Sequence, residues 1–150
     1  MKPNAIKTMN IQLGDIIVTN RFLYRHYGIY AGNGRVIHYA AENGDFGADV
    51  KVRETSLEQF AHGGECKRVL LAENRTRSGQ FSPEETISRA KSRMGEKHYD
   101  LLFNNCEHFA YWCKSGTNKS VQVEKAVSAA VILGTAIVVA NVIKSVHDYY

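Results

Sequence analysis

The sequence has few of the residues that mark linkers or cross-link small domains. Only two of its 150 residues are proline and three are cysteine, and no segment repeats at a fixed period or is low in complexity. The lack of repeats excludes a solenoid, and the scarcity of proline leaves no proline-rich linker. With 44% apolar and 23% charged residues, the chain is expected to fold around one hydrophobic core.

A secretory start is also missing, because the first ten residues, MKPNAIKTMN, contain no apolar core of a signal peptide. An odd number of cysteines does not suit a disulfide framework either. We therefore expect free thiols in a reducing compartment, where a cysteine serves packing or chemistry.

Patterns for metal and phosphate binding are absent as well. A zinc site built from Cys106, His108, His26 and His38 has no CxxC or HxxxH spacing to support it. The segment Gly32–Gly34 is too short for a phosphate-binding loop. The sequence therefore predicts neither a metal nor a cofactor.

The formal net charge is +4, and all of the excess lies in residues 1–120. Acidic residues are interspersed, so a solvated surface is favoured over a site for phosphate head groups, and no specific nucleic-acid partner is expected. The basic residues concerned are Lys67, Arg68, Arg75, Arg77, Arg89, Lys91, Arg93 and Lys97.

One long apolar run is present near the C-terminus. Ala126–Ile143 contains no charge and lies between Lys125 and Lys144. As a helix it would be about 27 Å long, close to the hydrocarbon thickness of a bilayer, and it is apolar on all sides. Residues 121–150 are therefore predicted to be a single-pass membrane anchor that leaves the catalytic domain in the cytoplasm. A buried core helix is the alternative.

The first 120 residues are expected to mix strands and helices. Apolar and β-branched runs predict strands at Asp15–Thr19, His26–Ala31, Arg35–Ala40, Val50–Arg53 and Lys67–Ala72. Helices are predicted at Ser56–Ala61, from the Ser82 cap to Gly95 with Ile87, Ala90 and Met94 on its apolar face, and at Cys106–Ser115 after an Asn105 cap.

The Asn33-Gly34 pair predicts a tight hairpin that brings His26 and His38 onto neighbouring strands. In a regular hairpin with this two-residue loop, the two histidines point to opposite faces. They can share a site only if the hairpin contains a bulge or a longer loop.

Cys106 is expected in the first turn of its helix, where unpaired N–H groups and the helix dipole would lower the pKa of the thiol and could bind an oxyanion. Cys113, seven residues further on, and Cys66 are interpreted as packing residues.

The segment Asn104–Ala110, NNCEHFA, resembles the cysteine motif of the lecithin:retinol acyltransferase family, which includes the H-Ras-like suppressor phospholipase/acyltransferases. Gly14-Asp15, the run Tyr24–Tyr30 (YRHYGIY) and Val36–His38 precede it in the order typical of that family. The resemblance covers roughly residues 10–120. It implies an α+β, circularly permuted papain-like domain (NlpC superfamily), with an antiparallel sheet packed on helices.

Carried over by motif, the resemblance implies that Cys106 is the nucleophile, His26 the general base and His38 the group that orients His26. It also implies a part for Tyr24 in the oxyanion site. Since members of the family place both histidines in one site, the hairpin should be irregular.

The activity implied is that of a phospholipid acyltransferase or phospholipase A with an acyl-Cys106 intermediate, with N-acylation of phosphatidylethanolamine among the reactions to expect. The acyl acceptor would be a lipid amine, an alcohol or water. Esterification of retinol or another alcohol is the alternative reaction. A non-catalytic membrane adaptor is the alternative of another class, and an export-dependent peptidoglycan peptidase is disfavoured.

Overall fold

The computed structural model describes residues 10–71, 80–97 and 102–116, with side chains described from Asn105 onward in the last segment. All of them belong to the unit Met1–Lys119. The strands are β1 Ile16–Asn20, β2 Arg25–Gly32, β3 Arg35–Ala40, β4 Lys51–Ser56 and β5 Cys66–Arg68, and the helices are α1 Leu57–Ala61, α2 Pro83–Ser92 and α3 Leu102–Ser115.

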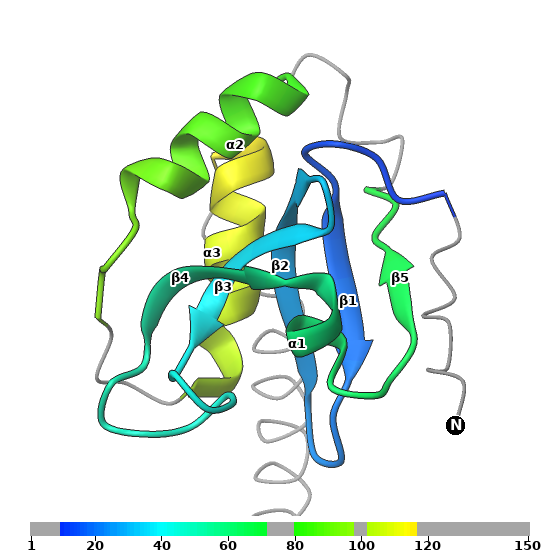
Figure 1. The fold of residues 1–150 in the computed structure, drawn as a ribbon. Coiled ribbons are helices and arrows are strands. Elements are labelled where there is room, and N and C mark those ends of the chain that lie inside the picture. The colour runs from blue at the N-terminus through cyan, green and yellow to red at the C-terminus, as the bar shows by residue number, and fades with distance from the viewer. Residues whose placement is uncertain (1–9, 72–79, 98–101, 117–150) are drawn as a thin grey trace, which may run out of the picture. The chain divides into compact units, whose positions relative to one another are not determined.

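The strands form one antiparallel sheet in the order β4-β3-β2-β1-β5. Together with the three helices this confirms the expected α+β class (Figure 1). The predicted strand at Lys67–Ala72 is wrong in length, because β5 ends at Arg68. Strand β5 pairs with β1, which begins at Ile16. The N–H of Val69 bonds to the Ile16 carbonyl, and β1 offers no earlier residue with which the chain after Val69 could pair.

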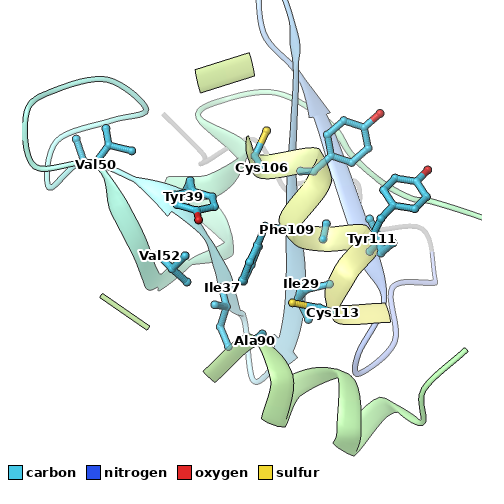
Figure 2. Close-up of a cluster of buried hydrophobic side chains, with 14 residues drawn as sticks. Ile29, Ile37, Tyr39, Val50, Val52, Ala90, Cys106, Phe109, Tyr111 and Cys113 are labelled. Atoms are coloured by element: carbon cyan, nitrogen blue, oxygen red, sulfur yellow. The ribbon is translucent and has the colours of Figure 1, made fainter. Parts of the chain in front are cut away.

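The two faces of the sheet carry different cores. One face packs against α2 and α3 (Figure 2), and its buried residues include Ile16, Tyr27, Ile29, Ile37, Tyr39, Val52, Ala90, Phe109 and Ala110. The opposite face packs against the short helix α1, and its buried residues are Ile17, Val36, Phe60, Ala61 and Cys66. Cys106 belongs to the first of these clusters, and Phe60 of the second lies against His26 and His38.

The capping box predicted at Ser82 is present, and the short helix α1 begins with a second one that was not predicted. Ser56 and Ser82 each accept a bond from the backbone N–H three residues later, and Gln59 and Glu85 return the bond. Helix α2 ends earlier than expected, at Ser92. Met94 therefore does not belong to its apolar face and is 45% exposed.

The predicted start of the third helix at Cys106 is wrong. Helix α3 already includes Leu102, so Asn105 is a helical residue and not the cap, and Cys106 is the fifth residue of the helix. No proline or glycine lies between Leu102 and Cys106 to prevent this earlier start.

The predicted membrane anchor, at residues 126–143, lies outside the described residues. Within the part of the chain that is described, no helix has both the length and the apolar character needed to cross a bilayer.

Candidate active site

The hairpin between β2 and β3 contains the irregularity that the sequence required. Gly32 pairs with Arg35, but Tyr30 pairs with Val36, so Ala31 is an extra residue in β2. Asn33 and Gly34 have φ of 50° and 68°, as the tight turn predicted from their sequence needs. The bulge shifts the register by one residue and turns both histidines to the same face.

His26 and His38 meet on that face. Nε2 of His26 lies 2.8 Å from Nδ1 of His38, and the two residues are 3% and 2% exposed. The ring of Phe60 lies against both imidazoles, with centroid distances of 5.2 and 5.0 Å. Helix α1 therefore covers the histidine pair with an apolar side chain.

Gly28 provides the space for this pair. A Cβ atom at this position would lie 2.7 Å from Cγ1 of Val36, 2.9 Å from Cε2 of Phe60 and 3.2 Å from Cβ of His38. Even an alanine would push against the layer that contains the imidazoles. Close packing against these atoms thus explains why a glycine occupies this position in the YRHYGIY run.

Thr55 on β4 helps to assign the protons of the two imidazoles. Its hydroxyl donates to the Ser56 carbonyl and lies 2.7 Å from Nε2 of His38. If the hydroxyl gives its one proton to Ser56, it accepts from Nε2–H of His38. Nδ1 of His38 then accepts from Nε2–H of His26, and Nδ1 of His26 is left unprotonated and able to act as a base.

The Cys106 thiol lies at an open edge of β2. Along a strand, the backbone N–H and C=O groups of successive residues point to alternate sides. Those of Tyr30 bond to the segment that begins β1, so those of Arg25 and Tyr27, an odd number of residues away, point toward the β3 side. The β2–β3 register begins only at Ile29↔Ile37, and the thiol occupies the edge beyond it, 3.9 Å from the Arg25 carbonyl oxygen. Cys106 therefore reaches the backbone on either side of His26.

Burial raises the pKa of the Cys106 thiol to about 11, although backbone N–H groups of Tyr27 and Glu107 act in the opposite direction. The expected lowering of this pKa is thus wrong. Cys106 is 1% exposed, and the loss of hydration outweighs the hydrogen bonds that favour the thiolate.

Burial also keeps the imidazoles neutral. It lowers the pKa of His26 to about 4, opposed by the charge of Asp45, and Arg21 lowers it further. The pKa of His38 is well below its usual value, because of burial first and of the neighbouring His26 second. The resting site is therefore a neutral thiol beside a neutral imidazole pair.

The sequence analysis missed a cluster of polar side chains beside the histidines. Asp45, in the loop between β3 and β4, accepts from Nε of Arg21 at 2.6 Å and from the Tyr24 hydroxyl at 2.5 Å. Its Oδ1 lies 3.6 Å from Nε2 of His26. The sequence around Asp45, ENGDFGAD, looks like an ordinary polar loop, so only the fold reveals this contact.

Tyr24 lies beside His26, with ring centroids 6.1 Å apart. Its single hydroxyl proton is directed at Asp45, and burial together with this bond raises its pKa. An oxyanion role for Tyr24 would require that bond to break.

Surface cavities adjoin this cluster. One of about 440 Å³ is bordered by Arg21, Tyr24 and Asp45, with the exposed Phe22 beside it. Another of about 210 Å³ is bordered by His38 and also by Asp45. A ligand can therefore approach the histidine pair from the Asp45 loop.

The remaining thiols and His108 lie elsewhere. Cys66 belongs to the apolar cluster under α1, and Cys113 to the cluster under α3, as expected for packing residues. Burial raises their pKa values to about 11 and about 12. His108 is half-buried on α3. Among the described residues, no three His, Cys, Asp or Glu side chains are grouped to hold a metal ion.

Comparison with known proteins places this fold and site in a family. The family model described as "Lecithin retinol acyltransferase" matches residues 9–119. Human lecithin retinol acyltransferase is 31% identical over 141 residues, which cover 79% of this chain and 61% of the relative. Human phospholipase A and acyltransferase 4 is 34% identical over 143 residues, which cover 83% and 84%.

Mouse phospholipase A and acyltransferase 3 is also similar, at 32% identity over 137 residues. The chain spans 61% and 58% of the length of the human and rat lecithin retinol acyltransferases. With a family match that covers most of the described unit, the chain belongs to the lecithin retinol acyltransferase family.

Proposed function

We propose that this protein is a phospholipid acyltransferase and phospholipase A that works through an acyl-Cys106 intermediate. The observation that carries the proposal is that the Cys106 thiol lies 3.9 Å from the Arg25 carbonyl, one residue before His26, whose imidazole is 2.8 Å from that of His38. The family relatives named for phospholipase A and acyltransferase activity support this choice of reaction.

The first half-reaction begins with proton transfer from the Cys106 thiol to Nδ1 of His26. The thiolate attacks the ester carbonyl of a phospholipid, and the C–O bond to glycerol breaks as the tetrahedral intermediate collapses. His26 returns the proton to the leaving alkoxide. The products are a lysophospholipid and an acyl-thioester on Cys106.

The second half-reaction transfers the acyl group. His26 removes a proton from water, an amine or an alcohol, and the acceptor attacks the thioester carbonyl. The proton then passes to the departing Cys106 sulfur. Through this step His38 keeps the His26 ring in its tautomer, and Thr55 does the same for His38.

Esterification of retinol is the alternative to phospholipid chemistry, because relatives of both kinds are similar to the chain, at 31% and 34% identity. A panel of retinol, phosphatidylethanolamine and water as acceptors, with one phospholipid donor, tests this choice. Predominant formation of retinyl ester would move the assignment to the other branch.

The decisive test is intact-protein mass spectrometry after incubation with phospholipid vesicles. Wild type should gain one acyl mass and release lysophospholipid, and Cys106→Ala should do neither. Cys113→Ala is the matched control, because it removes a buried thiol from the same helix and should keep the adduct. Activity that survives Cys106→Ala would rule out this mechanism, and absence of an adduct in wild type would favour the adaptor.

We also propose that the fold is a permuted papain-like domain and that residues 126–143 anchor it to a membrane, with the catalytic unit in the cytoplasm. The order His26, His38, Cys106 and the uncharged run between Lys125 and Lys144 support these proposals. Deletion of residues 121–150 should lower activity on vesicles more than activity on a dispersed short-chain ester. Equal losses would contradict the anchor.

A further inference from the structure

Asp45 is fixed beside the site by partners from the turn between β1 and β2. Arg21 binds both carboxylate oxygens, with Nε at 2.6 Å and an Nη at 3.3 Å, and Tyr24 donates a third hydrogen bond. Arg21 is fixed in turn by the Phe60 carbonyl at 2.8 Å and the Ala61 carbonyl at 3.4 Å. The loop carboxylate is thus held by three hydrogen bonds, and Arg21, which makes two of them, is itself held by α1.

This carboxylate faces His26 without forming the bond that orients it. Oδ1 of Asp45 lies 3.6 Å from Nε2 of His26, while the Nε2 proton is directed to His38 at 2.8 Å. Asp45 is therefore placed to act on the imidazole through its charge. Its side chain is 12% exposed, so water screens that charge only weakly.

We propose that Asp45 is the counter-ion for the imidazolium that His26 forms when it takes the proton of Cys106. The S–H bond of Cys106 breaks, an N–H bond forms at Nδ1 of His26, and Asp45 stays ionised throughout. Asp45 is thus a positioning residue for the acyl-transfer reaction, and this inference rests on the role of His26 in the proposed function.

The other groups around His26 do not replace Asp45. Arg21 opposes the imidazolium, while Asp45 favours it, and burial is the largest effect on the pKa of His26. His38 is buried and neutral, and Tyr24 keeps its proton. From α1 the neighbour of the ring is the apolar Phe60.

On the thiol side, burial comes first in raising the pKa of Cys106, and Glu107 on α3 also raises it. Asp45 contributes in the same direction. Its carboxylate lies 3.6 Å from Nε2 of His26, and the proposal rests on this contact.

Asp45→Asn keeps the size of the side chain and removes its charge. An opposite charge at this distance shifts a pKa by about 1–3 units, so the population of the thiolate–imidazolium pair should fall by about tenfold or more. The test measures the rate at which iodoacetamide alkylates Cys106 from pH 5 to 11, in a background where Cys66 and Cys113 are alanine.

The alkylation rate near neutral pH reports the population of the thiolate–imidazolium pair. The rise of the rate at alkaline pH reports the Cys106 thiolate formed while the imidazole is neutral. Asp45→Asn should lower the neutral part at least tenfold and leave the alkaline rise at wild-type height or shift it to lower pH. Asp49→Asn is the matched control. Asp49 lies in the same loop, accepts from the Glu42 backbone at 2.9 Å and pairs with Arg53.

An Asp49→Asn rate within twofold of wild type is expected. The inference fails if Asp45→Asn alkylates like wild type, if both parts of its profile fall together as a loosened loop would cause, or if the parent protein has no neutral-pH component. Alkylation needs no acyl donor. An Asp45 effect without any acyl adduct would therefore keep this inference and refute the proposed function.

Discussion

The two faces of strand β2 differ in character although they share one backbone. The odd-numbered Tyr27 and Ile29 are buried in the apolar cluster under α3, while the even-numbered His26 and Gly28 face the imidazole layer under α1. The difference teaches that Cys106, on α3, and His26, under α1, belong to opposite sides of the sheet. The Cys106 thiol reaches the backbone of β2 at Arg25, one residue before His26, where the β2–β3 register has not yet begun.

Both partners are buried on their own side, and burial keeps each of them uncharged. The pKa of Cys106 is raised to about 11 and that of His26 is lowered to about 4. Charge separation must therefore be supported locally when a substrate arrives. Three predictions test the comparison between the faces, in addition to the cysteine and aspartate variants above.

The largest effect is expected from deletion of Ala31, which removes the bulge. The regular hairpin would turn one histidine into the apolar face, at a cost of about 3 kcal/mol or more, and acylation of Cys106 should be abolished. Circular dichroism, urea unfolding and adduct mass spectrometry measure the outcome. Ala31→Ser keeps the residue count and should retain activity, whereas a folded deletion variant with wild-type acylation would disprove the role of the bulge.

Acid should destabilise the imidazole face first. The unfolded pKa of a histidine is near 6.5, and that of His26 in the fold is about 4, so the unfolded state binds the extra proton between these values. The free energy of unfolding is highest above pH 6.5 and should fall by about 3 kcal/mol as the pH decreases to 4. Urea unfolding at several pH values measures this loss.

His26→Gln is the control for the acid effect, and it should flatten much of the slope between pH 6.5 and 4. The Asp45 carboxyl has its pKa lowered to about 2 by Arg21 and its other partners against the effect of burial, so its stabilisation is lost only between about pH 3.8 and 2. The two windows are separate. A stability that stays constant from pH 7 to 4.5 would contradict the burial of a neutral His26.

The smallest effect is expected from a change of one methyl or methylene group on each face of β2. Gly28→Ala adds a methyl group against Val36 and Phe60, and Ile29→Val removes a methylene from the opposite face. Each should lower the free energy of unfolding by about 1 kcal/mol. Only Gly28→Ala should also slow acylation, by about tenfold, because it displaces the imidazoles. Equal acylation rates in the two variants would show that the faces are not functionally distinct.

Much of the fold could be predicted from the sequence because its signals are local. The capping boxes at Ser56 and Ser82 and the Asn33-Gly34 turn depend on residues within three positions of each other. The need for an irregular hairpin also followed from counting, since side chains alternate along a strand. The start of α3 could not be read in this way, because Asn105 is compatible with both a cap and a helix interior.

The sequence by itself determined the family motifs and the candidate residues Cys106, His26 and His38, because these depend on residue type and spacing. Together with the family resemblance it also predicted an irregular hairpin, with either a bulge or a longer loop. Only the tertiary structure placed Asp45 beside His26 and raised the pKa of Cys106 instead of lowering it. Both results depend on which groups lose water when distant segments pack together. That loss of hydration has no local signature in the chain.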